Sequence, residues 1–481
     1  MTYTTAPRLR RRHTIELAML AVALTVFATG LCLTGLQLHA QVPDLLWLAT
    51  AVLGGSALAV HVALRFCAPW ADPLILPLAV LLNGIGFIVI WGLHAEAGDP
   101  PTAAFRQLLW TGLGQLGCLT TVLLVRHPQR LQRYPYLMAL AGLVLLASPM
   151  LPVIGLDQYG SRRWLSFNGF TVQPSEFAKI PLVLFLAAYL GMKRDILALA
   201  AAQITVRGVK IFSVPRMRDM GPMTAAWGIA ILILVGTKDL GTSLLLFTVF
   251  LAMLYTATLR KSWVGIGVAM FLAGAYVAYL LFWHVRQRVT IWLHAFDPGV
   301  YYAPQGSAQV VEGLFALADG GLFGLGFGQG RAATLFASDS DLIMVSVGEK
   351  FGLAGVAAVL LVTLLLVERA FRVALAARDT FVKLMTTGFA FLWAFQVFVV
   401  VGGVTLLIPL SGMTTPLLSV GGSSLVTTWI MLGLWLRVSS EVRRAAVSRC
   451  HDDTATMELP RSAVSPTPPP TASNKSATDQ E

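Results

Sequence analysis

Long apolar runs separated by short polar segments make up most of this chain. A helix needs about 20 mostly apolar residues to cross the hydrocarbon core of a bilayer. Runs of that length recur from near the N-terminus to residue 436. The pattern predicts an all-α polytopic membrane protein with about twelve transmembrane helices. The expected spans are 15–37, 44–64, 73–93, 104–125, 135–155, 175–192, 221–237, 240–258, 263–283, 343–367, 382–403 and 415–436.

One polar interruption divides the apolar run from Gly221 to Thr258. Lys238 and Asp239 are its only charged residues, and Gly236 and Gly241 flank them. The run is too long for one span, so we expect two helices hinged at this pair. A carboxylate at membrane depth is costly and is a functional-site hypothesis by default. The alternative is a polar turn that surfaces between the two helices.

Composition agrees with the membrane class. Hydrophobic residues are 56% of the 481 residues, charged residues are 12%, and the mean hydropathy is +0.72. A soluble protein would have too little polar surface to cover such a chain. The four cysteines lie far apart, with neither metal-ligand nor disulfide spacing. The sequence contains no Walker-type nucleotide motif, which disfavours an ATP-driven pump.

Charge predicts the orientation in the membrane. The net charge of +11 comes largely from Lys and Arg in short connecting segments, which are topology signals and not a nucleic-acid-binding face. If the N-terminal Arg8 and Arg10 to Arg12 are cytoplasmic, most of the 35 Lys and Arg residues fall in cytoplasmic segments. The positive-inside rule requires this bias. Both termini are therefore expected in the cytoplasm.

A smaller set of cations falls on the outer side, against that rule. They are Arg106, Arg162, Arg163, Lys179, Lys238, Arg286, Arg288, Arg331 and Lys350. One explanation is a cluster that neutralises an anionic ligand outside the membrane. The other is pairing with outer carboxylates such as Asp319 and Asp341, and it explains Arg286, Arg288 and Arg331 equally well.

The other segments suggest how the chain is divided. We expect a basic cytoplasmic N-terminus (1–14), two additional N-terminal spans (15–66), a membrane core (67–437) and a cytoplasmic tail (438–481). From about residue 450 the tail is rich in Pro, Ser and Thr, which predicts disorder.

Two segments inside the core differ from the spans around them. The basic segment 193–220 is predicted to be an interfacial cytoplasmic helix and loop resting on anionic lipid headgroups. Residues 284–342 form a large extracytoplasmic loop between spans nine and ten. Long loops on a rigid scaffold concentrate function, and the many glycines of this loop could cradle phosphate.

Three outer segments carry polar groups that we expect to converge on Asp239. In the first, Glu176 and Lys179 are three residues apart, on one face of a helix that begins near Pro174. The alternative for this pair is a local ion bridge that lets both side chains enter the membrane edge. The second segment contains Asp341, and the third is a run of small residues after Pro409. Small residues also simply let helices approach closely.

As an ordered set, the motifs of these segments resemble the SEDS family (shape, elongation, division and sporulation), which includes RodA and FtsW. The motifs are SRRWL (161–165), QPSEFAK (173–179), DLGTS (239–243), SDSDLI (338–343), GEK (348–350), PLSG (409–412) and TPLLSVGGSS (415–424). The resemblance extends from about Asp72 to Arg437. Family members usually have ten spans, and the two additional N-terminal spans resemble the longer, RodA-like members.

The resemblance implies a peptidoglycan glycosyltransferase. Such enzymes polymerise lipid II, a disaccharide-peptide on undecaprenyl diphosphate, at the outer face of the bacterial cytoplasmic membrane, for cell elongation and shape or for division. They work with a class B penicillin-binding protein. The essential aspartate of the family falls on Asp239, and its functional Glu and Lys fall on Glu176 and Lys179.

This chemistry fits the residues. The attacking sugar hydroxyl needs a general base, for which Asp239 is the candidate. The leaving diphosphate needs cations, from side chains or from a divalent metal ion. No organic cofactor and no nucleic acid are expected, and membrane lipids are the other partners. The supporting residues are expected to be Glu176, Lys179, Arg162, Arg163, Trp164, Gln173, Lys238, Thr242, Ser243, Asp341, Ser423 and Ser424.

The sequence departs from the family pattern at four places, which suggests a specialised paralogue with altered substrate or partner selection. Lys238 replaces a common Pro, Glu312 lies in a common Gln-Ser position, Lys350 replaces an acid, and Val420 replaces a Tyr. Two other functions remain open. A flippase for lipid-linked precursors would need polar groups at the midplane and on both faces. A non-catalytic scaffold for a penicillin-binding protein would have no use for a buried carboxylate.

Overall fold

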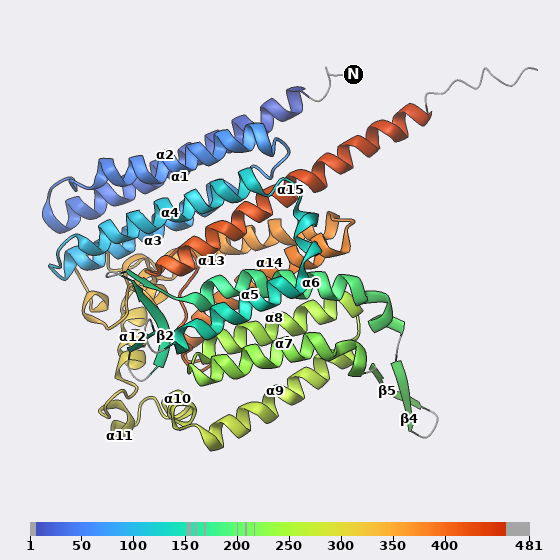
Figure 1. Ribbon diagram of the computed structural model, residues 1–481. Helices are drawn as coiled ribbons and strands as arrows, with labels where there is room; N and C mark the ends of the chain where they lie inside the picture. Colours follow the sequence, from blue (N-terminus) through green and yellow to red (C-terminus); the bar gives the residue numbers. More distant parts are fainter. Residues whose placement is uncertain are drawn as a thin grey trace, which may run out of the picture.

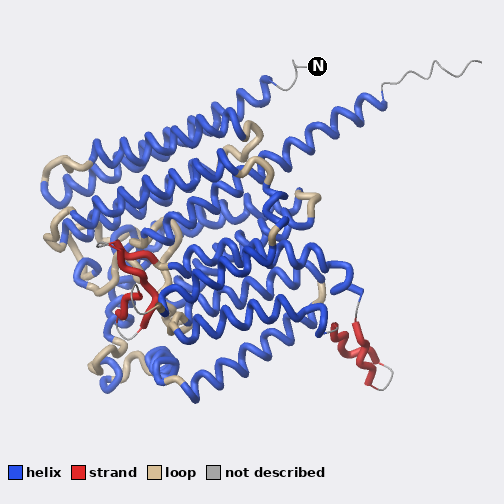
Figure 2. The backbone as a smooth tube through the Cα atoms, viewed as in Figure 1, coloured by secondary structure: helices blue, strands red, loops and turns tan. Residues whose placement is uncertain are grey.

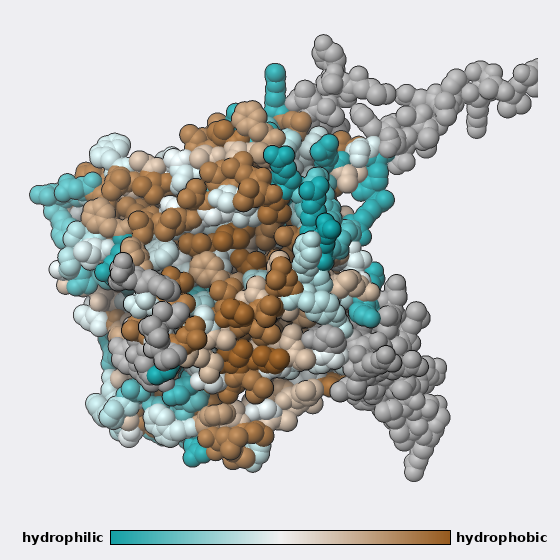
Figure 3. Space-filling model, viewed as in Figure 1, coloured by the Kyte–Doolittle hydropathy of each residue, from teal (hydrophilic) through white to brown (hydrophobic). Residues whose placement is uncertain are grey.

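The computed structural model describes residues 6–151, 155–158, 161–167, 170–199, 201–206, 209–215 and 217–457. Long helices lie side by side in a bundle, and a small β-sheet lies near each end of it (Figures 1 and 2). On the face shown in Figure 3, apolar side chains cover the middle of the bundle, and hydrophilic residues gather toward its two ends. This distribution is expected for a protein whose central surface contacts lipid.

The long helices, in chain order, are α1 (Ala6–His39), α2 (Leu46–Cys67), α3 (Ile75–Glu96), α4 (Thr102–Leu124), α5 (Pro135–Ala147), α6 (Pro174–Leu199), α7 (Met217–Gly236), α8 (Leu240–Thr258), α9 (Lys261–Leu281), α13 (Ile343–Ala376), α14 (Thr380–Val404) and α15 (Gly422–Met457). Each overlaps one predicted span. In the described part of the chain, nine helices are long and apolar enough to cross a membrane. The helical membrane fold is therefore confirmed. The apolar stretches of α5 and α7 are shorter, and α15 is not among the nine.

Two helix boundaries differ from the predicted ones. The chain leaves helix α5 at Ala147 and makes a short 3₁₀ turn, η2 (Ser148–Met150), because Pro149 cannot continue the hydrogen-bond ladder. Helix α15 begins only at Gly422, after an irregular segment that contains Pro416. It then continues to Met457, past the predicted end at residue 436 and into the segment predicted as a tail. Residues 458–481 lie outside the described residues.

The all-α prediction is wrong for two short segments. Strands β1 (Gly155–Gln158), β2 (Ser161–Phe167) and β3 (Phe170–Val172) form an antiparallel sheet in that order. Strands β4 (Ala201–Val206) and β5 (Val209–Pro215) form a hairpin where we expected a helix and loop. Alternating β-branched residues favour strands in the second segment, but its basic composition suggested an interfacial helix.

The long loop after α9 is mostly structured. It contains α10 (Trp283–Leu293), α11 (Pro298–Tyr301), α12 (Ala308–Asp319) and the 3₁₀ turn η3 (Ala332–Thr334). A further 3₁₀ turn, η1 (Pro128–Arg133), lies outside this loop and connects α4 to α5. Some glycines of the long loop pack against α13, and others, such as Gly326 and Gly328, lie against α1. A Cβ atom on Gly324 would lie 2.3 Å from the Lys350 carbonyl oxygen, and one on Gly330 would lie 2.5 Å from the Glu349 carboxylate. These glycines therefore permit close packing, which explains them without the phosphate cradle considered from the sequence.

The departure at Lys350 has a structural explanation. Its side chain is buried, and Nζ lies 2.8 Å from the Glu96 carboxylate and 3.1 Å from that of Glu349. Nζ also donates a hydrogen bond to the Gln329 carbonyl (2.7 Å). Lys350 thus connects α3, α13 and the long loop. Its position in this ion-pair network is structural.

The two ends of the bundle differ in what they carry. The start of α1, the far end of α15 and the β4–β5 hairpin lie at one end, whereas the β1–β3 sheet and α10 to α12 lie at the other (Figure 1). The additional helices α1 and α2 pack on α3 and α4, and α15 packs on α4. The end with the β1–β3 sheet also holds the residues predicted to carry the chemistry.

Candidate functional site

Asp239 follows the last turn of α7 in a Schellman motif. The Asp239 N–H donates to the Leu234 carbonyl (2.9 Å), and the Lys238 N–H donates to the Val235 carbonyl (3.1 Å). Lys238 occupies the left-handed position of this motif with φ of 60°, a position where glycine is usual. The hinge predicted at this pair is therefore a helix cap that turns the chain directly into α8.

Asp239 is also the N-cap residue of α8, and the residue is only 3% exposed. One oxygen, Oδ1, accepts a hydrogen bond from the Thr242 N–H (3.2 Å), and Oδ2 accepts one from the Ser175 hydroxyl (3.2 Å). The Ser243 hydroxyl donates to the Asp239 main-chain carbonyl (2.8 Å). The helix N-terminus favours the negative charge. Each carboxylate oxygen retains acceptor capacity beyond these bonds.

The start of α6 supplies a second buried group of charges. Lys179 Nζ lies 2.7 Å from Glu176 Oε1, and the two residues are 2% and 7% exposed. Lys179 also donates to Gln396 Oε1 (3.3 Å), and the Gln396 amide donates to the Thr414 carbonyl (2.8 Å). The local ion pair considered for these residues is therefore present. It also fixes α6 to α14 and to the irregular segment before α15.

A hydrogen-bonded chain connects α15 to Asp239. The Gln173 N–H donates to the Ser423 hydroxyl oxygen (2.8 Å), and the Gln173 side-chain amide donates to the Ser175 hydroxyl oxygen (3.1 Å). Ser175 in turn donates to Asp239. The neighbouring Ser424 hydroxyl is buried without a hydrogen-bond partner among the described residues.

The irregular segment 409–421 holds the other outer segments together. Its Ser419 hydroxyl donates to the Ser340 carbonyl (2.7 Å), and the Val420 N–H donates to the Asp339 carbonyl (2.8 Å). A Cβ atom on Gly241 would lie 3.0 Å from the Ser411 carbonyl oxygen, so glycine allows α8 to approach this segment closely. The three outer segments thus converge beside Asp239 in space, although their roles in binding remain predictions.

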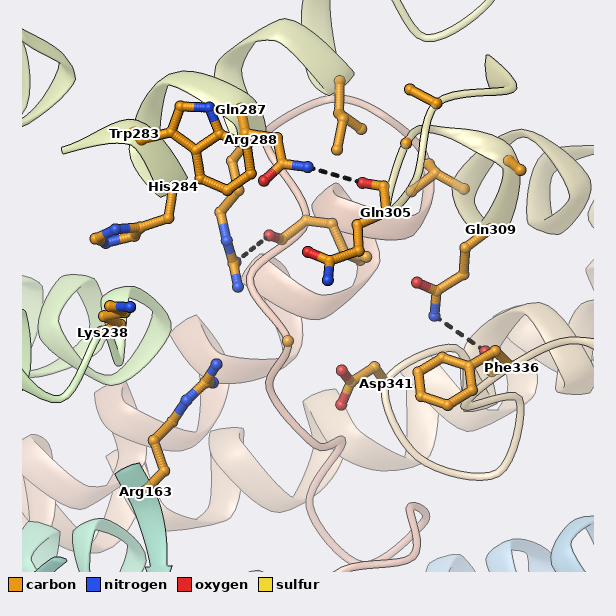
Figure 4. A pocket seen from close by; sticks show the side chains of 17 residues that line it. Arg163, Lys238, Trp283, His284, Gln287, Arg288, Gln305, Gln309, Phe336 and Asp341 are labelled. Carbon is orange, nitrogen blue, oxygen red and sulfur yellow. Dashed lines mark hydrogen bonds between the residues drawn. The ribbon is translucent and has the colours of Figure 1, made fainter. Parts of the chain in front are cut away.

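A pocket of about 650 Å³ lies beside this network. Arg163, Lys238, His284 and Arg288 line it together with the carboxylate of Asp341 (Figure 4). Arg288 comes from α10, and its Nη1 donates to the Leu410 carbonyl (2.6 Å). These groups come from a strand, a helix cap, a short helix and a loop, so the fold gathers the cations from distant parts of the chain.

Burial and neighbouring charges change the pKa values in the pocket. Burial lowers the pKa of Arg288, the charge of Arg163 lowers it further, and Asp239 and Asp341 act in the opposite direction. Burial also lowers the pKa of His284, and the positive charge of Lys238 adds to that effect. The pocket therefore combines a neutral imidazole with fixed cations, which suits an anionic ligand.

Burial raises the pKa of Asp341, although Arg163 and Arg288 oppose that shift. In the described part of the chain, no group of three or more His, Cys, Asp or Glu residues is placed to hold a metal ion by itself.

Strand β2 separates the predicted residues of the SRRWL motif. Side chains alternate between the two faces of a strand, and Arg163 lines the pocket whereas Arg162 and Trp164 do not. Arg162 is exposed and Trp164 is half-buried. Of the cations predicted as supporting residues, Arg163 and Lys238 line the pocket, and Lys179 lies in the buried pair. Arg288, another of the outer cations, also lines the pocket.

Several residues of the site were not predicted. Ser175 lies inside the QPSEFAK motif, so its position beside Glu176 was a usable signal. Arg288 and His284 are on the long loop, and Gln396 is an isolated polar residue of α14. Arg331 pairs with Glu312 and Asp319, as one explanation expected. Arg288 instead donates a hydrogen bond to the Leu410 main-chain carbonyl.

The protein is a helical membrane bundle in which a buried helix-capping carboxylate lies beside a cation-lined pocket. This arrangement is typical of a membrane protein whose site at one face suits an anionic headgroup. The chain belongs to the FtsW/RodA/SpoVE family. The sequence model of that family, described as "Cell cycle protein", matches residues 73–444.

Individual relatives agree. The chain is 41% identical over 452 residues to the peptidoglycan glycosyltransferase RodA of Mycobacterium tuberculosis, covering 92% of this chain and 94% of that protein. It is 39% identical over 464 residues to the protein of the same name from Mycobacterium leprae, covering 93% and 95%. Stage V sporulation protein E of Bacillus subtilis is 30% identical over 379 residues, covering 76% and 96%.

Solved structures share the fold. A chain from a study of how a peptidoglycan synthase complex coordinates polymerization and crosslinking superposes with a TM-score of 0.60 at 26% identity, covering 77% of this chain and 98% of that one. The rod shape determining protein RodA of Thermus thermophilus superposes with a TM-score of 0.52 at 25% identity, covering 77% and 96%. Each match includes nearly all of the solved chain but only 77% of this one.

Proposed function

We propose that this protein is a peptidoglycan glycosyltransferase that polymerises lipid II into glycan strands. The names of its relatives support this activity. The observation that carries it is the junction of α7 and α8, where one turn presents Lys238 to a cation-lined pocket and holds the Asp239 carboxylate directly behind it.

In the reaction, the hydroxyl of one sugar attacks the anomeric carbon of another and expels the lipid diphosphate. Asp239 is the general base that accepts the proton of the attacking hydroxyl. The leaving diphosphate lies against Arg163, Lys238 and Arg288, whose charges stabilise it as it departs. A divalent cation bound with the diphosphate would add a further positive charge, and Asp341 is the carboxylate in the pocket lining that could contact it.

The remaining buried residues act on position. Thr242 and Ser175 hold the carboxylate of Asp239, and Gln173 and Ser423 hold Ser175. Glu176 and Lys179 pair with each other and Lys179 donates to Gln396, so we assign them the role of fixing α6 against α14. Such preorganised support is what keeps a base within reach of its proton.

For the topology, we propose twelve spans with both termini in the cytoplasm, in a multi-pass protein of the bacterial cytoplasmic membrane. An even number of passes agrees with the position of α1 and the end of α15 at one end of the bundle (Figure 1). The pocket then faces the outside, and the β4–β5 hairpin of the segment 193–220 lies at the cytoplasmic lipid surface. This orientation also satisfies the positive-inside rule.

A class B penicillin-binding protein is the proposed partner, because polymerised strands must be cross-linked. The similarity to a chain of a peptidoglycan synthase complex supports this proposal. The high identity to two RodA proteins favours a role in elongation and shape over one in division.

One experiment tests the proposal against its alternatives. Purified full-length protein is incubated with lipid II, with and without a co-expressed transpeptidase, and glycan polymer is measured. The glycosyltransferase forms polymer, and EDTA tests the need for a divalent cation. A flippase would form no polymer. If the protein is only a scaffold, any polymer formed in the presence of the transpeptidase would not depend on Asp239.

A further inference from the structure

The pocket has two chemically different sides. Figure 4 shows the side chains of Arg163, Lys238 and His284 on one side and those of Gln305, Gln309 and Phe336 on the other, with Arg288 between them. The second side carries amides, an aromatic ring and the carboxylate of Asp341 but no cation. A diphosphate has no electrostatic reason to extend over it.

Two hydrogen bonds fix the side of the pocket that has no cation. The Gln309 amide donates to the Phe336 carbonyl (3.0 Å), which ties α12 to the loop before α13. The Gln287 amide donates to the Gln305 carbonyl (3.0 Å), which ties α10 to the loop after α11. Each of these bonds uses an amide N–H and leaves the side-chain carbonyl oxygen as an acceptor.

Gln305 is held in an unusual backbone conformation. Its φ is 57°, in the left-handed region that non-glycine residues rarely adopt. The two residues that follow are fixed by hydrogen bonds. The Gly306 N–H donates to the Ala303 carbonyl (2.9 Å), the Ser307 N–H donates to the Val300 carbonyl (3.1 Å), and the Ser307 hydroxyl donates to the Ala295 carbonyl (2.5 Å). Strained residues that a rigid neighbourhood holds in place are concentrated at functional sites.

The result is an amide directed into the pocket. The Gln305 side chain is exposed, makes no hydrogen bond within the described part of the chain, and points toward the space between Arg288 and Asp341 (Figure 4). Phe336 is 67% exposed and presents its ring at the same side. An amide and an aromatic ring together are well suited to a ligand with hydroxyl groups on its edge and C–H groups on its face.

We propose that Gln305, Gln309 and Phe336 form a saccharide subsite that holds an N-acetylated sugar ring of the substrate next to its diphosphate. The amides supply donors and acceptors for hydroxyl and acetamido groups, and the Phe336 ring packs on the C–H face of the sugar. The inference rests on the proposed function and specifies how the substrate is oriented in the pocket. Its diphosphate lies at Lys238 and Arg163, and its sugar lies under α12.

Two ligands test the two sides of the pocket separately. Binding of undecaprenyl diphosphate, which has no sugar, is compared with binding of the same lipid carrying the disaccharide-peptide, using purified full-length protein. Gln305→Gly removes the amide and suits the left-handed backbone, and Phe336→Leu removes the ring but keeps apolar bulk. Each variant should bind the saccharide ligand about 3-fold to 10-fold more weakly, as expected for one or two lost contacts. Binding of the sugarless lipid should not change.

Control variants show whether the effect is local. Tyr302→Ala changes an exposed aromatic residue of the same loop that does not line the pocket, and it should bind both ligands as the wild type does. Phe336→Tyr keeps an aromatic face and should retain the saccharide affinity. Both controls should melt at the same temperature as Phe336→Leu. Gln305→Gly should melt at that temperature or slightly above it, because glycine relieves the left-handed backbone at this position.

Three outcomes would overturn the assignment or its basis, and they are distinguishable. Unchanged saccharide affinity in Gln305→Gly and Phe336→Leu would overturn the subsite. An equal loss for both ligands would also overturn it, because these residues would then serve the diphosphate. If the wild type formed no polymer and bound neither ligand, the proposed function itself would fail.

Discussion

Lys238 and Asp239 are adjacent in one helix cap, yet the Lys238 side chain lines an open pocket while the Asp239 carboxylate is buried behind it. The left-handed conformation of Lys238 produces this division, because it reverses the chain between α7 and α8. Proline, with φ locked near −65°, cannot occupy this backbone. A proline here, which the resemblance implies for many family members, would need a different turn and would not supply a cation to the site.

Replacing Lys238 tests a conflict between stability and function. Lys238→Gly should stabilise the protein by about 1 kcal/mol, because glycine removes the strain of the left-handed residue. It should also weaken lipid II binding, since a pocket cation is lost. Thermal unfolding and KM for lipid II measure the two effects. Leu259, with φ of 56° at the far end of α8, gives a matched control. Leu259→Gly should stabilise without changing KM, and equal KM values in both variants would remove Lys238 from the site.

The alternation along β2 predicts a contrast between two neighbouring arginines. Arg163→Gln should weaken lipid II binding about 10-fold to 100-fold, as expected for loss of a hydrogen bond from a charged donor. Arg162→Gln, which changes a residue outside the pocket lining, should change binding less than about 2-fold. KM and product yield at saturating substrate are the measurements. A larger effect of Arg162→Gln would mean that the strand presents its other face to the substrate.

The lowered pKa of His284 predicts proton uptake on ligand binding. In the free pocket the imidazole is neutral at neutral pH. A bound diphosphate offsets the charges of Lys238, Arg288 and Arg163, so it should raise the pKa of His284. Linkage then requires the affinity for diphosphate to increase as the pH falls from about 8 to about 6. His284→Gln should flatten this dependence, measured as the Kd of undecaprenyl diphosphate across that range. An unchanged slope in the variant would assign the proton to another group, such as Asp341.

The buried pair of Glu176 and Lys179 allows a test of position against charge. Either single change to Ala should destabilise the protein by about 3–5 kcal/mol, because it leaves an uncompensated buried charge. Exchanging the two residues restores the pairing, so thermal stability should largely return. Activity should not, since residue 179 would no longer donate to Gln396 and the segment before α15 would lose its support. Full recovery of polymer in the exchange variant would show that only the charge pair matters.

The sequence was most informative where the signal was local. The hinge at Lys238 and Asp239 could be predicted because two charges interrupt an apolar run, and Glu176 and Lys179 could be paired because they are three residues apart on a helix. The β1–β3 sheet could not, since its partners are specified by pairing and not by hydropathy. For the same reason the separation of Arg162 from Arg163 was not predicted.

Contacts between distant segments were also beyond the sequence. Arg288 reaches the Leu410 carbonyl across 122 positions, and nothing near either residue indicates that contact. The two explanations offered for Arg288, an anionic ligand and pairing with a carboxylate, both rested on its charge, and neither included this contact. Helix α15 was predicted too short for a related reason. Hydropathy marks where a helix leaves the apolar layer, and α15 continues past that point.

Asp239→Asn tests the assignment of the base. Asparagine is as good an N-cap as aspartate. Its side-chain oxygen can still accept from the Thr242 N–H, and the Ser175 hydroxyl can rotate to accept from the amide. Folding should therefore be nearly unchanged, which thermal unfolding would show. The amide cannot take the proton of the attacking hydroxyl, and loss of general-base catalysis should reduce polymer formation about 10²-fold to 10⁴-fold.

Binding separates this variant from a damaged pocket. Lipid II affinity should persist in Asp239→Asn, because Arg163, Lys238 and Arg288 remain to hold the diphosphate. Asp239→Glu should also polymerise poorly, since its longer side chain moves the carboxylate by about one bond within a site fixed by Thr242 and Ser175. Polymer at the wild-type rate from a well-folded Asp239→Asn protein, with its transpeptidase bound, would falsify the assignment of Asp239 as the base. Retained binding with loss of polymer would establish that the carboxylate acts on the reaction and not on substrate capture.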